Sequence, residues 1–246
     1  MSAAGEARRR CGALTAAEVA ALDAAAVDSG VPILALMEVA GWQVARCAWR
    51  MLGRRADTVL VLAGRGNNGG DGLVAARHLR AWGCAVEVAV MGEEARLRGA
   101  VVEQMAAARG AGVTVRAGGA AAGLAAATRA AALCIDALLG TGLRSAPREP
   151  DAGAIEAMAG ARVLSVDVPS GLDASSGEAH APCVTAEVTC TLTAVKSGLW
   201  TASGRAHAGR VVVADIGMPA TAWRACGLRA PEAVRGGALL RVPSSF

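Results

Sequence analysis

The sequence contains few aromatic residues: one Phe, five Trp and no Tyr among 246 residues. Proteins that bind single-stranded nucleic acids stack the bases on aromatic side chains, so a platform of that kind is not expected. The formal net charge is only +4, and the one tight basic cluster, residues 8–10, is interpreted as part of a solvated N-terminal tail. We therefore expect no nucleic-acid partner.

Long apolar runs are also missing, because charged residues or glycines interrupt each of them. A membrane helix needs roughly 20 consecutive apolar residues, and a secretion signal needs an uninterrupted apolar segment near the N-terminus. The seven cysteines are odd in number and include no CxxC pair, which disfavours a disulfide framework and a zinc site. These absences predict a cytoplasmic protein with no membrane partner, whose cysteines are small buried apolar residues.

The remaining composition is that of a folded protein, with 54% hydrophobic and 19% charged residues. A length of 246 residues suits one large α/β domain. We expect this domain over residues 14–219, a flexible N-terminal tail over residues 1–13 and a C-terminal tail over residues 220–246.

Helix and strand patterns alternate along the chain, which is typical of βαβ units and a mainly parallel sheet. A capping box at Thr15 predicts a first helix, and a second helix runs from Pro32 to about Leu52. Strands are expected over residues 58–63, 84–91, 113–117, 133–139 and 163–168, with helices over 71–82, 93–109, 120–132 and 151–162. Two further strands, over 188–195 and 210–216, leave no room for a helix between them and could pair antiparallel.

A glycine-rich turn over residues 64–72, with the sequence GRGNNGGDG, follows the first strand. Ligands bind beyond the carboxyl ends of strands in open α/β sheets, and the GxGxxG spacing in this turn is one used for phosphates. Asp71, however, would repel an anion at the start of the next helix. Either Asp71 caps that helix and the asparagines only form a turn, or their oxygens gather around a cation or the polar end of a ligand.

Two later strands each carry a carboxylate near their end. Asp136 interrupts an apolar strand and precedes a second glycine-rich turn, and Asp167 does the same before Ser170 and Asp173. A buried Asp is costly unless it is paired or bound to a metal. One such residue could be structural, but three strand ends that deliver carboxylates or amides to one sheet edge predict a functional site.

These segments together resemble the YjeF N-terminal domain family, the NAD(P)H-hydrate epimerases. The similarity covers residues 36–41, 61–72, 136–142, 166–173 and 213–217, in the order found in the family. The resemblance implies a Rossmann-like three-layer α/β/α sandwich that forms a homodimer and binds K⁺. It also implies an isomerase that interconverts the R and S forms of hydrated NADH and NADPH in cofactor repair, with the dinucleotide as substrate.

The family's binding residues transfer to this chain position by position. The K⁺ ligands correspond to Asn68, Asp136 and Ser170. The substrate contacts correspond to Asn67, Asn68, Gly69, Gly70, Asp71, Gly140, Thr141, Gly142, Leu143, Arg144, Ser145, Ala146 and Asp167. Loss and re-addition of a ring hydroxyl needs a carboxyl that acts as general acid and base, and we assign this catalytic role to Asp167.

Lys196, the dehydratase activity and the type of function each allow more than one interpretation. Lys196, the only lysine, could approach a phosphate or a carboxylate, or could be solvated at a strand end. Many relatives carry a dehydratase domain on the same chain, and here we expect a separate ADP- or ATP-dependent NAD(P)H-hydrate dehydratase. Two rival functions are a Rossmann oxidoreductase, which would need an acid at the end of the second strand where Glu87 lies too early, and a non-catalytic scaffold.

Overall fold

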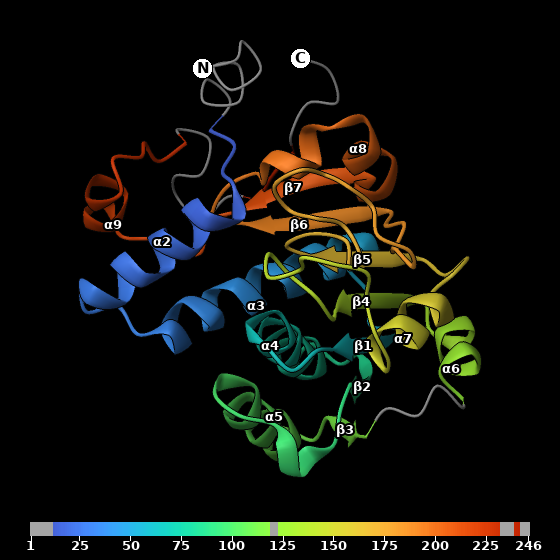
Figure 1. Cartoon of the computed structure of the whole chain (residues 1–246). Helices are drawn as coiled ribbons and strands as arrows, with labels where there is room; N and C mark the ends of the chain where they lie inside the picture. The colour runs from blue at the N-terminus through green and yellow to red at the C-terminus, as the bar shows by residue number, and fades with distance from the viewer. Residues whose placement is uncertain (1–11, 119–122, 232–238, 242–246) are drawn as a thin grey trace.

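The computed structural model describes residues 12–118, 123–231 and 239–241. Within them the chain forms one open sheet in the order β3-β2-β1-β4-β5-β6-β7-β8 (Figure 1). The strands are β1 (Thr58–Ala63), β2 (Ala85–Val90), β3 (Thr114–Ala117), β4 (Leu133–Ala137), β5 (Val163–Val166), β6 (Val188–Leu192), β7 (Arg210–Ala214) and β8 (Leu239–Arg241). Neighbouring strands from β3 to β7 are parallel, and β8 is antiparallel to β7. The predicted α/β fold with a mainly parallel sheet is confirmed.

Helices cover both faces of this sheet and complete three layers (Figure 1). The helices are α2 (Ala16–Asp28), α3 (Ile33–Met51), α4 (Asn67–Ala81), α5 (Ala100–Gly110), α6 (Leu124–Ala130), α7 (Asp151–Ala157), α8 (Ala202–Ala208) and α9 (Ala220–Ala225), with single 3₁₀ turns at Glu94–Arg96 and Ser197–Trp200. None of the helices in the described part of the chain has both the length and the apolar character needed to cross a bilayer.

Strand β1 lies between two hydrophobic cores. Val59, Val61 and Ala63 pack into the core that includes α3 and α4, whereas Leu60 and Leu62 pack into the core that includes α6 and α7. Successive side chains of a strand point to opposite faces, so an unbroken apolar run is what a strand covered on both faces requires. Each fully buried Val or Leu contributes about 1.5–3 kcal/mol, which anchors the edge that carries the site.

The two N-terminal helices begin where the sequence predicts. The Thr15 side chain accepts a hydrogen bond from the Glu18 amide at 3.3 Å, and Glu18 accepts one from the Thr15 amide at 2.7 Å. This reciprocal capping box fixes the start of α2. Helix α3 then buries one side against α4 and the sheet. Helices α2 and α3 thus both reach the carboxyl edge of the strands.

One prediction about the end of the sheet is wrong. The segment between β6 and β7 holds the 3₁₀ turn Ser197–Trp200 and α8, and the two strands are parallel. Helix α8 is only 7 residues long, and its start is capped by Thr201, whose hydroxyl accepts a hydrogen bond from the Gly204 amide at 2.9 Å. A run of Ala, Gly and Ser has little helical periodicity, so tertiary packing decides its conformation.

The ends of the chain add two unpredicted elements. Helix α9 and strand β8 both lie in the segment expected as a C-terminal tail, and Ala222 and Trp223 of α9 are buried. The expected N-terminal tail falls almost wholly outside the described residues. Of the cysteines within them, four are buried and two are half-buried, as the composition predicts.

Candidate active site

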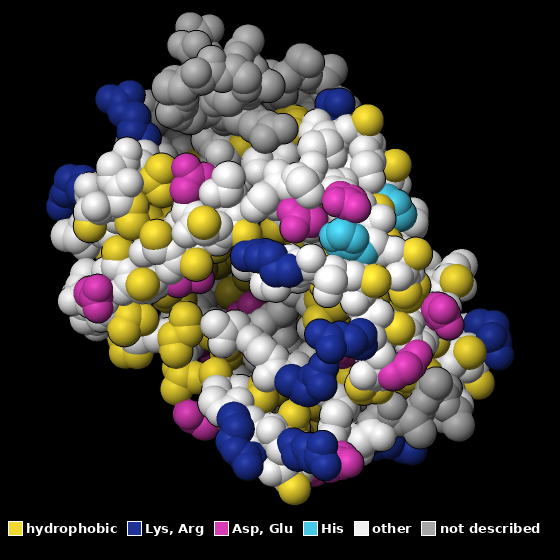
Figure 2. All heavy atoms as spheres, viewed as in Figure 1, with side chains coloured by type: hydrophobic (Ala, Val, Ile, Leu, Met, Phe, Trp, Pro, Cys, Tyr) yellow, Lys and Arg dark blue, Asp and Glu magenta, His cyan; other side chains and the backbone are white. Residues whose placement is uncertain are grey.

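A cavity of about 910 Å³ opens at the carboxyl ends of β1, β4, β5 and β6. Open α/β sheets bind ligands at this edge, and the volume is that of a small-molecule site. The hollow is visible in Figure 2 with Lys and Arg side chains beside it. Its walls come from α2, α3, the beginning of α4 and the segment that follows β4.

The glycine-rich turn after β1 is shorter than predicted, because α4 begins immediately after Gly66. Asp71 therefore lies inside the helix, and the alternative that it caps the helix is wrong. A Cβ on Gly64 would lie 1.9 Å from the carbonyl oxygen of Leu138, and a Cβ on Gly69 would lie 2.0 Å from that of Gly64. These glycines let the turn pack directly against the end of β4. Close packing is therefore a structural reason for the glycine motif, in addition to any contact with phosphate.

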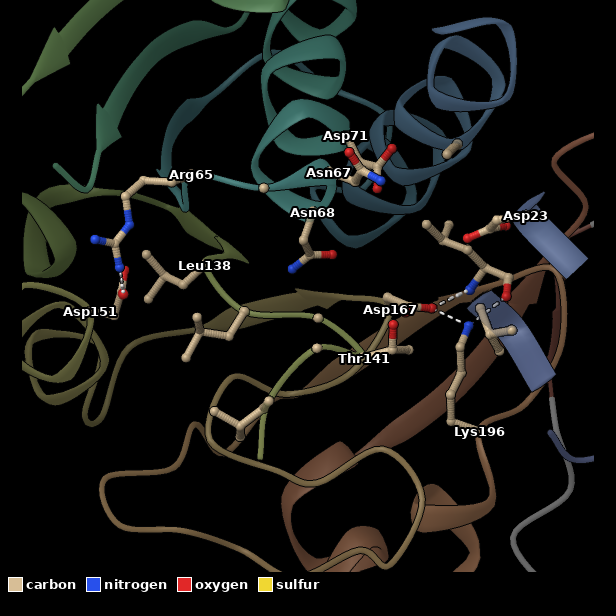
Figure 3. A pocket seen from close by; sticks show the side chains of 18 of the residues that line it. Asp23, Arg65, Asn67, Asn68, Asp71, Leu138, Thr141, Asp151, Asp167 and Lys196 are labelled. Carbon is tan, nitrogen blue, oxygen red and sulfur yellow. Dashed lines mark hydrogen bonds and ion pairs between the residues drawn. The ribbon is translucent and has the colours of Figure 1, made fainter. Parts of the chain in front are cut away.

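Asn68 reaches into the cavity from the first turn of α4 (Figure 3). Its Nδ2 atom is buried and has no hydrogen-bond partner within the described residues. A Cβ on Gly140 would come within 3.4 Å of the Asn68 side chain, so the turn after β4 passes close to this amide. A buried N–H donor without a partner is costly unless an acceptor atom of a ligand satisfies it.

Asp136 lies behind the cavity wall and not in it. The side chain is fully buried in β4, and its carboxylate accepts hydrogen bonds from Ser165 Oγ at 2.8 Å, Ser170 Oγ at 2.5 Å and the Ser170 amide at 2.9 Å. Burial raises the pKa of Asp136, and these hydrogen bonds act in the opposite direction. The Ser170 hydroxyl also accepts a hydrogen bond from the Leu139 amide at 2.9 Å, which ties the ends of β4 and β5 together.

Asp167 and Lys196 form a buried ion pair that lines the cavity (Figure 3). The Asp167 carboxylate also accepts a hydrogen bond from the Leu192 amide at 3.0 Å, and the Lys196 ammonium donates a second one to the Leu192 carbonyl at 2.6 Å. Lys196 is 1% exposed, so the alternative of a solvated strand end is wrong. Asp167 has a φ of 69° and Thr193, also in the cavity wall, has a φ of 65°. Left-handed backbone at non-glycine residues is strained, and such strain tends to concentrate at functional sites.

Two further carboxyls face this ion pair. Burial raises the pKa of Asp71 well above its ordinary value, the charges of Asp167 and Asp23 add to the rise, and Lys196 opposes it. In the part of the chain that the structure describes, no hydrogen bond to the Asp71 carboxyl offsets this rise. Burial also raises the pKa of Asp23 to about 6, with Lys196 opposing the rise and Asp167 adding to it. One end of the cavity therefore holds three acids and one lysine.

Asp23 was not among the predicted site residues, although the sequence contains a signal for it. Asp23 stands four residues after Val19 and three before Ala26, so it lies on the apolar face of α2. A carboxylate on such a face is a candidate for function. Arg65 and Asp151, which form an ion pair of 2.7 Å at the other end of the cavity, were not predicted either.

The cavity brings together most of the predicted substrate contacts. Those that line it are Asn67, Asn68, Asp71, Gly140, Thr141, Gly142, Leu143, Arg144, Ser145, Ala146 and Asp167. Gly69 and Gly70 instead pack beneath the turn, Gly69 on Gly64 and Gly70 on Met37. Asp136 and Ser170 lie behind the wall, and Asn68 is the one predicted K⁺ ligand in the cavity itself. Within the described residues, no group of three or more His, Cys, Asp or Glu side chains is arranged to hold a metal ion.

Comparison with known proteins places these residues in a family. The model of the YjeF-related protein N-terminus matches residues 33–198. A bifunctional NAD(P)H-hydrate repair enzyme of Pyrobaculum aerophilum is 42% identical over 84% of this chain and 42% of its own length. An NAD(P)H-hydrate epimerase of Pirellula staleyi is 39% identical over 76% of this chain and 83% of its own length. The chain thus spans less than half of the bifunctional relative and most of the epimerase.

The fold has a solved counterpart as well. The crystal structure of the yeast protein ynu0 matches with a TM-score of 0.78 and 25% identity, and the match covers 94% of this chain and 99% of the yeast chain. The family match includes both the glycine-rich turn with Asn68 and Asp71 and the segment with Asp167 and Ser170. The chain belongs to the family of the YjeF-related protein N-terminus.

Proposed function

We propose that this chain is an NAD(P)H-hydrate epimerase, which interconverts the R and S forms of hydrated NADH and NADPH. One observation carries the proposal: α4, the end of β5 and the segment after β6 bring Asp71, Asp167 and Lys196 to one cavity (Figure 3). Family membership supports the choice of substrate. The competing oxidoreductase would need an acid at the end of β2, and Glu87 lies in the middle of that strand.

The reaction calls for one group that donates a proton and one that accepts a proton beside the ring. The hydrate carries a hydroxyl on the ring carbon next to nitrogen, and loss of that hydroxyl with help from the nitrogen lone pair gives a planar cation. Water can then add from either face. A carboxyl that protonates the leaving hydroxyl and a carboxylate that takes a proton from the incoming water are sufficient. Nearby negative charge stabilises the cation between these steps.

We divide these roles between two residues. Asp167 accepts hydrogen bonds from Lys196 and the Leu192 amide, and we assign it the role of the base that takes a proton from water. Burial raises the pKa of Asp71, so its carboxyl keeps a proton that it can donate. The C–O bond breaks as the oxygen takes the Asp71 proton and leaves as water, while the nitrogen lone pair forms the C=N bond. Water adds to the other face and gives its proton to Asp167, and exchange with solvent restores both groups.

The family's potassium ion fits the residues present. Asn68 packs on Gly140 in the turn that begins beside Asp136 and Ser170, so its side-chain oxygen is available close to theirs. Amide, hydroxyl and carboxylate oxygens are the ligands that hard cations prefer. We propose that Asn68, Asp136 and Ser170 would hold K⁺, which would supply a fixed positive charge near the turn and the anionic substrate.

An epimerisation assay tests the function. The R hydrate is supplied to a dehydratase that consumes only the S hydrate, and its disappearance is followed with and without this protein in K⁺ buffer. We expect wild type to accelerate consumption. We expect Asp167→Asn to lower that rate by about 10²–10⁴-fold, because the variant lacks the base.

A matched variant separates loss of the base from a general effect of losing a carboxylate. Asp57 lies at the amino end of β1, at the opposite edge of the sheet, where it accepts a hydrogen bond from the Thr58 amide at 2.8 Å. Asp57→Asn should epimerise as fast as wild type. No acceleration by wild type, even at protein equal in concentration to substrate, would refute the proposed function.

Three expectations accompany the proposal. A dehydratase that consumes the S form should be the functional partner. This chain should form a homodimer, and the epimerase and the dehydratase should both work in the cytoplasm. Co-purification with the dehydratase activity and sedimentation of the isolated chain test the first two.

A further inference from the structure

The end of the cavity opposite Asp167 and Lys196 holds a second polar pair (Figure 3). Arg65, in the turn after β1, donates a hydrogen bond from Nη2 to Oδ2 of Asp151 at 2.7 Å. Asp151 is the first residue of α7, so the pair joins segments 86 residues apart. A Cβ on Gly92 would lie 3.0 Å from Cδ of Arg65, which shows that the arginine stem packs tightly against the end of β2.

Both members of the pair have polar atoms that the pair itself does not hydrogen-bond. Asp151 is 4% exposed, and its Oδ1 atom is buried without a hydrogen-bond partner within the described residues. The Arg65 side chain is 53% exposed, so most of its donors face the cavity or solvent. The Arg65 guanidinium thus has N–H groups available for a ligand, and the buried Oδ1 atom of Asp151 beside it can accept a hydrogen bond from one.

Arginines line the cavity as well as acids. Arg65, Arg144 and Arg148 line it, together with Asp151 and Glu149. The other end holds three acids and one lysine. Arg65 at one end and these acids at the other favour one direction for a ligand that carries phosphates at one end and a ring that becomes positive at the other.

We infer that Arg65 and Asp151 form a subsite for a phosphate-bearing ribose, with the Arg65 guanidinium on a phosphate oxygen and Asp151 Oδ1 accepting a hydrogen bond from a ribose hydroxyl. The inference rests on the proposed function, because it names the end of the dinucleotide that this pair recognises. Arg matches phosphate oxygens well, and the carboxylate holds it in place for the ligand.

Kinetics with both hydrates test the subsite. We expect Arg65→Ala to raise KM about tenfold or more with kcat unchanged, because the lost contact is made equally in the bound substrate and in the transition state. Arg65→Lys should recover part of the loss. A loss confined to hydrated NADPH identifies the 2′-phosphate as the contact, and an equal loss for both hydrates identifies the diphosphate; either supports the subsite. Unchanged KM for both would overturn it.

A binding measurement separates this inference from the function. Calorimetric titration with ADP-ribose and with 2′-phospho-ADP-ribose, which lack nicotinamide, needs no epimerase activity. Wild type should bind at least one of them about tenfold more tightly than Arg65→Ala or Asp151→Ala does. The matched control is Arg162→Ala, which removes an exposed Arg–Glu187 pair of 2.7 Å outside the cavity and should bind like wild type. Equal affinity of wild type and Arg65→Ala for both probes would refute the subsite even if epimerisation is observed.

Discussion

Replacement of Asp23 by Asn tests the charge balance of the cavity through protein stability. Asp23 lies on α2, and burial raises the pKa of its carboxyl from 3.8 to about 6; Lys196 opposes this rise and Asp167 adds to it. Each tenfold change in an ionisation constant corresponds to 1.36 kcal/mol, so the rise amounts to about 3 kcal/mol. Asp71, which also faces Asp23, is present in both proteins.

The sign of the effect follows from proton binding. Between about pH 4 and pH 6 the folded protein keeps a proton on Asp23 that the unfolded chain has already released. The contribution of Asp23 to the free energy of unfolding therefore falls as the pH rises through this window and is constant above it. Asp23→Asn removes this loss, so the variant should gain up to about 3 kcal/mol over wild type between pH 4 and pH 8.

Urea unfolding followed by tryptophan fluorescence at several pH values measures this difference. The difference between variant and wild type is the relevant quantity, because other acids titrate in both proteins and cancel. Asp57→Asn, at the amino end of β1, should show the pH dependence of wild type. If Asp23→Asn and wild type lose stability in parallel between pH 4 and pH 8, the electrostatic account of the cavity is wrong.

Two other substitutions probe the packing and charge of the site. Lys196→Met should lower the free energy of unfolding in urea by about 3–5 kcal/mol, because it leaves the buried Asp167 carboxylate without its charge partner. The double variant with Asp167→Asn should recover most of this loss. A double variant as unstable as Lys196→Met would contradict this reasoning. Gly69→Ala should lower the free energy of unfolding by about 2 kcal/mol or more, since its Cβ would lie 2.0 Å from the Gly64 carbonyl oxygen. Gly66→Ala, with open space around its Cβ, should lower it by less than about 1 kcal/mol. Equal losses would show that the turn does not need this close approach.

Local patterns in the sequence were enough to predict the sheet and its functional edge. Unbroken apolar runs predict strands covered on both faces, and a polar residue that interrupts such a run is visible without coordinates. Asp167 was found in this way, and it lines the cavity as expected. Asp136 was found by the same signal, but the sequence could not show that its carboxylate lies behind the cavity wall and accepts hydrogen bonds from two serine hydroxyls.

Contacts between distant segments account for what the sequence could not predict. Lys196 is buried because Asp167, 29 residues earlier, offers a charge partner, and no local pattern reveals such a pair. The helix before β7 is a further example, because its alanines and glycines have no periodicity and the packing against the sheet selects the helix. The pairing of Arg65 with Asp151 likewise depends on how α7 follows β4.

The cavity concentrates several features that lower the stability of the fold. A buried ion pair is often no more stabilising than apolar side chains of the same size, and here it stands beside two carboxyls whose pKa values burial raises. Asp167 also has a left-handed backbone. Such features persist in one place when they serve a ligand, because fixed charge that is unfavourable in the empty protein becomes favourable when a positive charge develops beside it. Arg65 at the opposite end would have the complementary effect on a phosphate, so in the proposed reaction one cavity would both orient the dinucleotide and stabilise the cation formed from its ring.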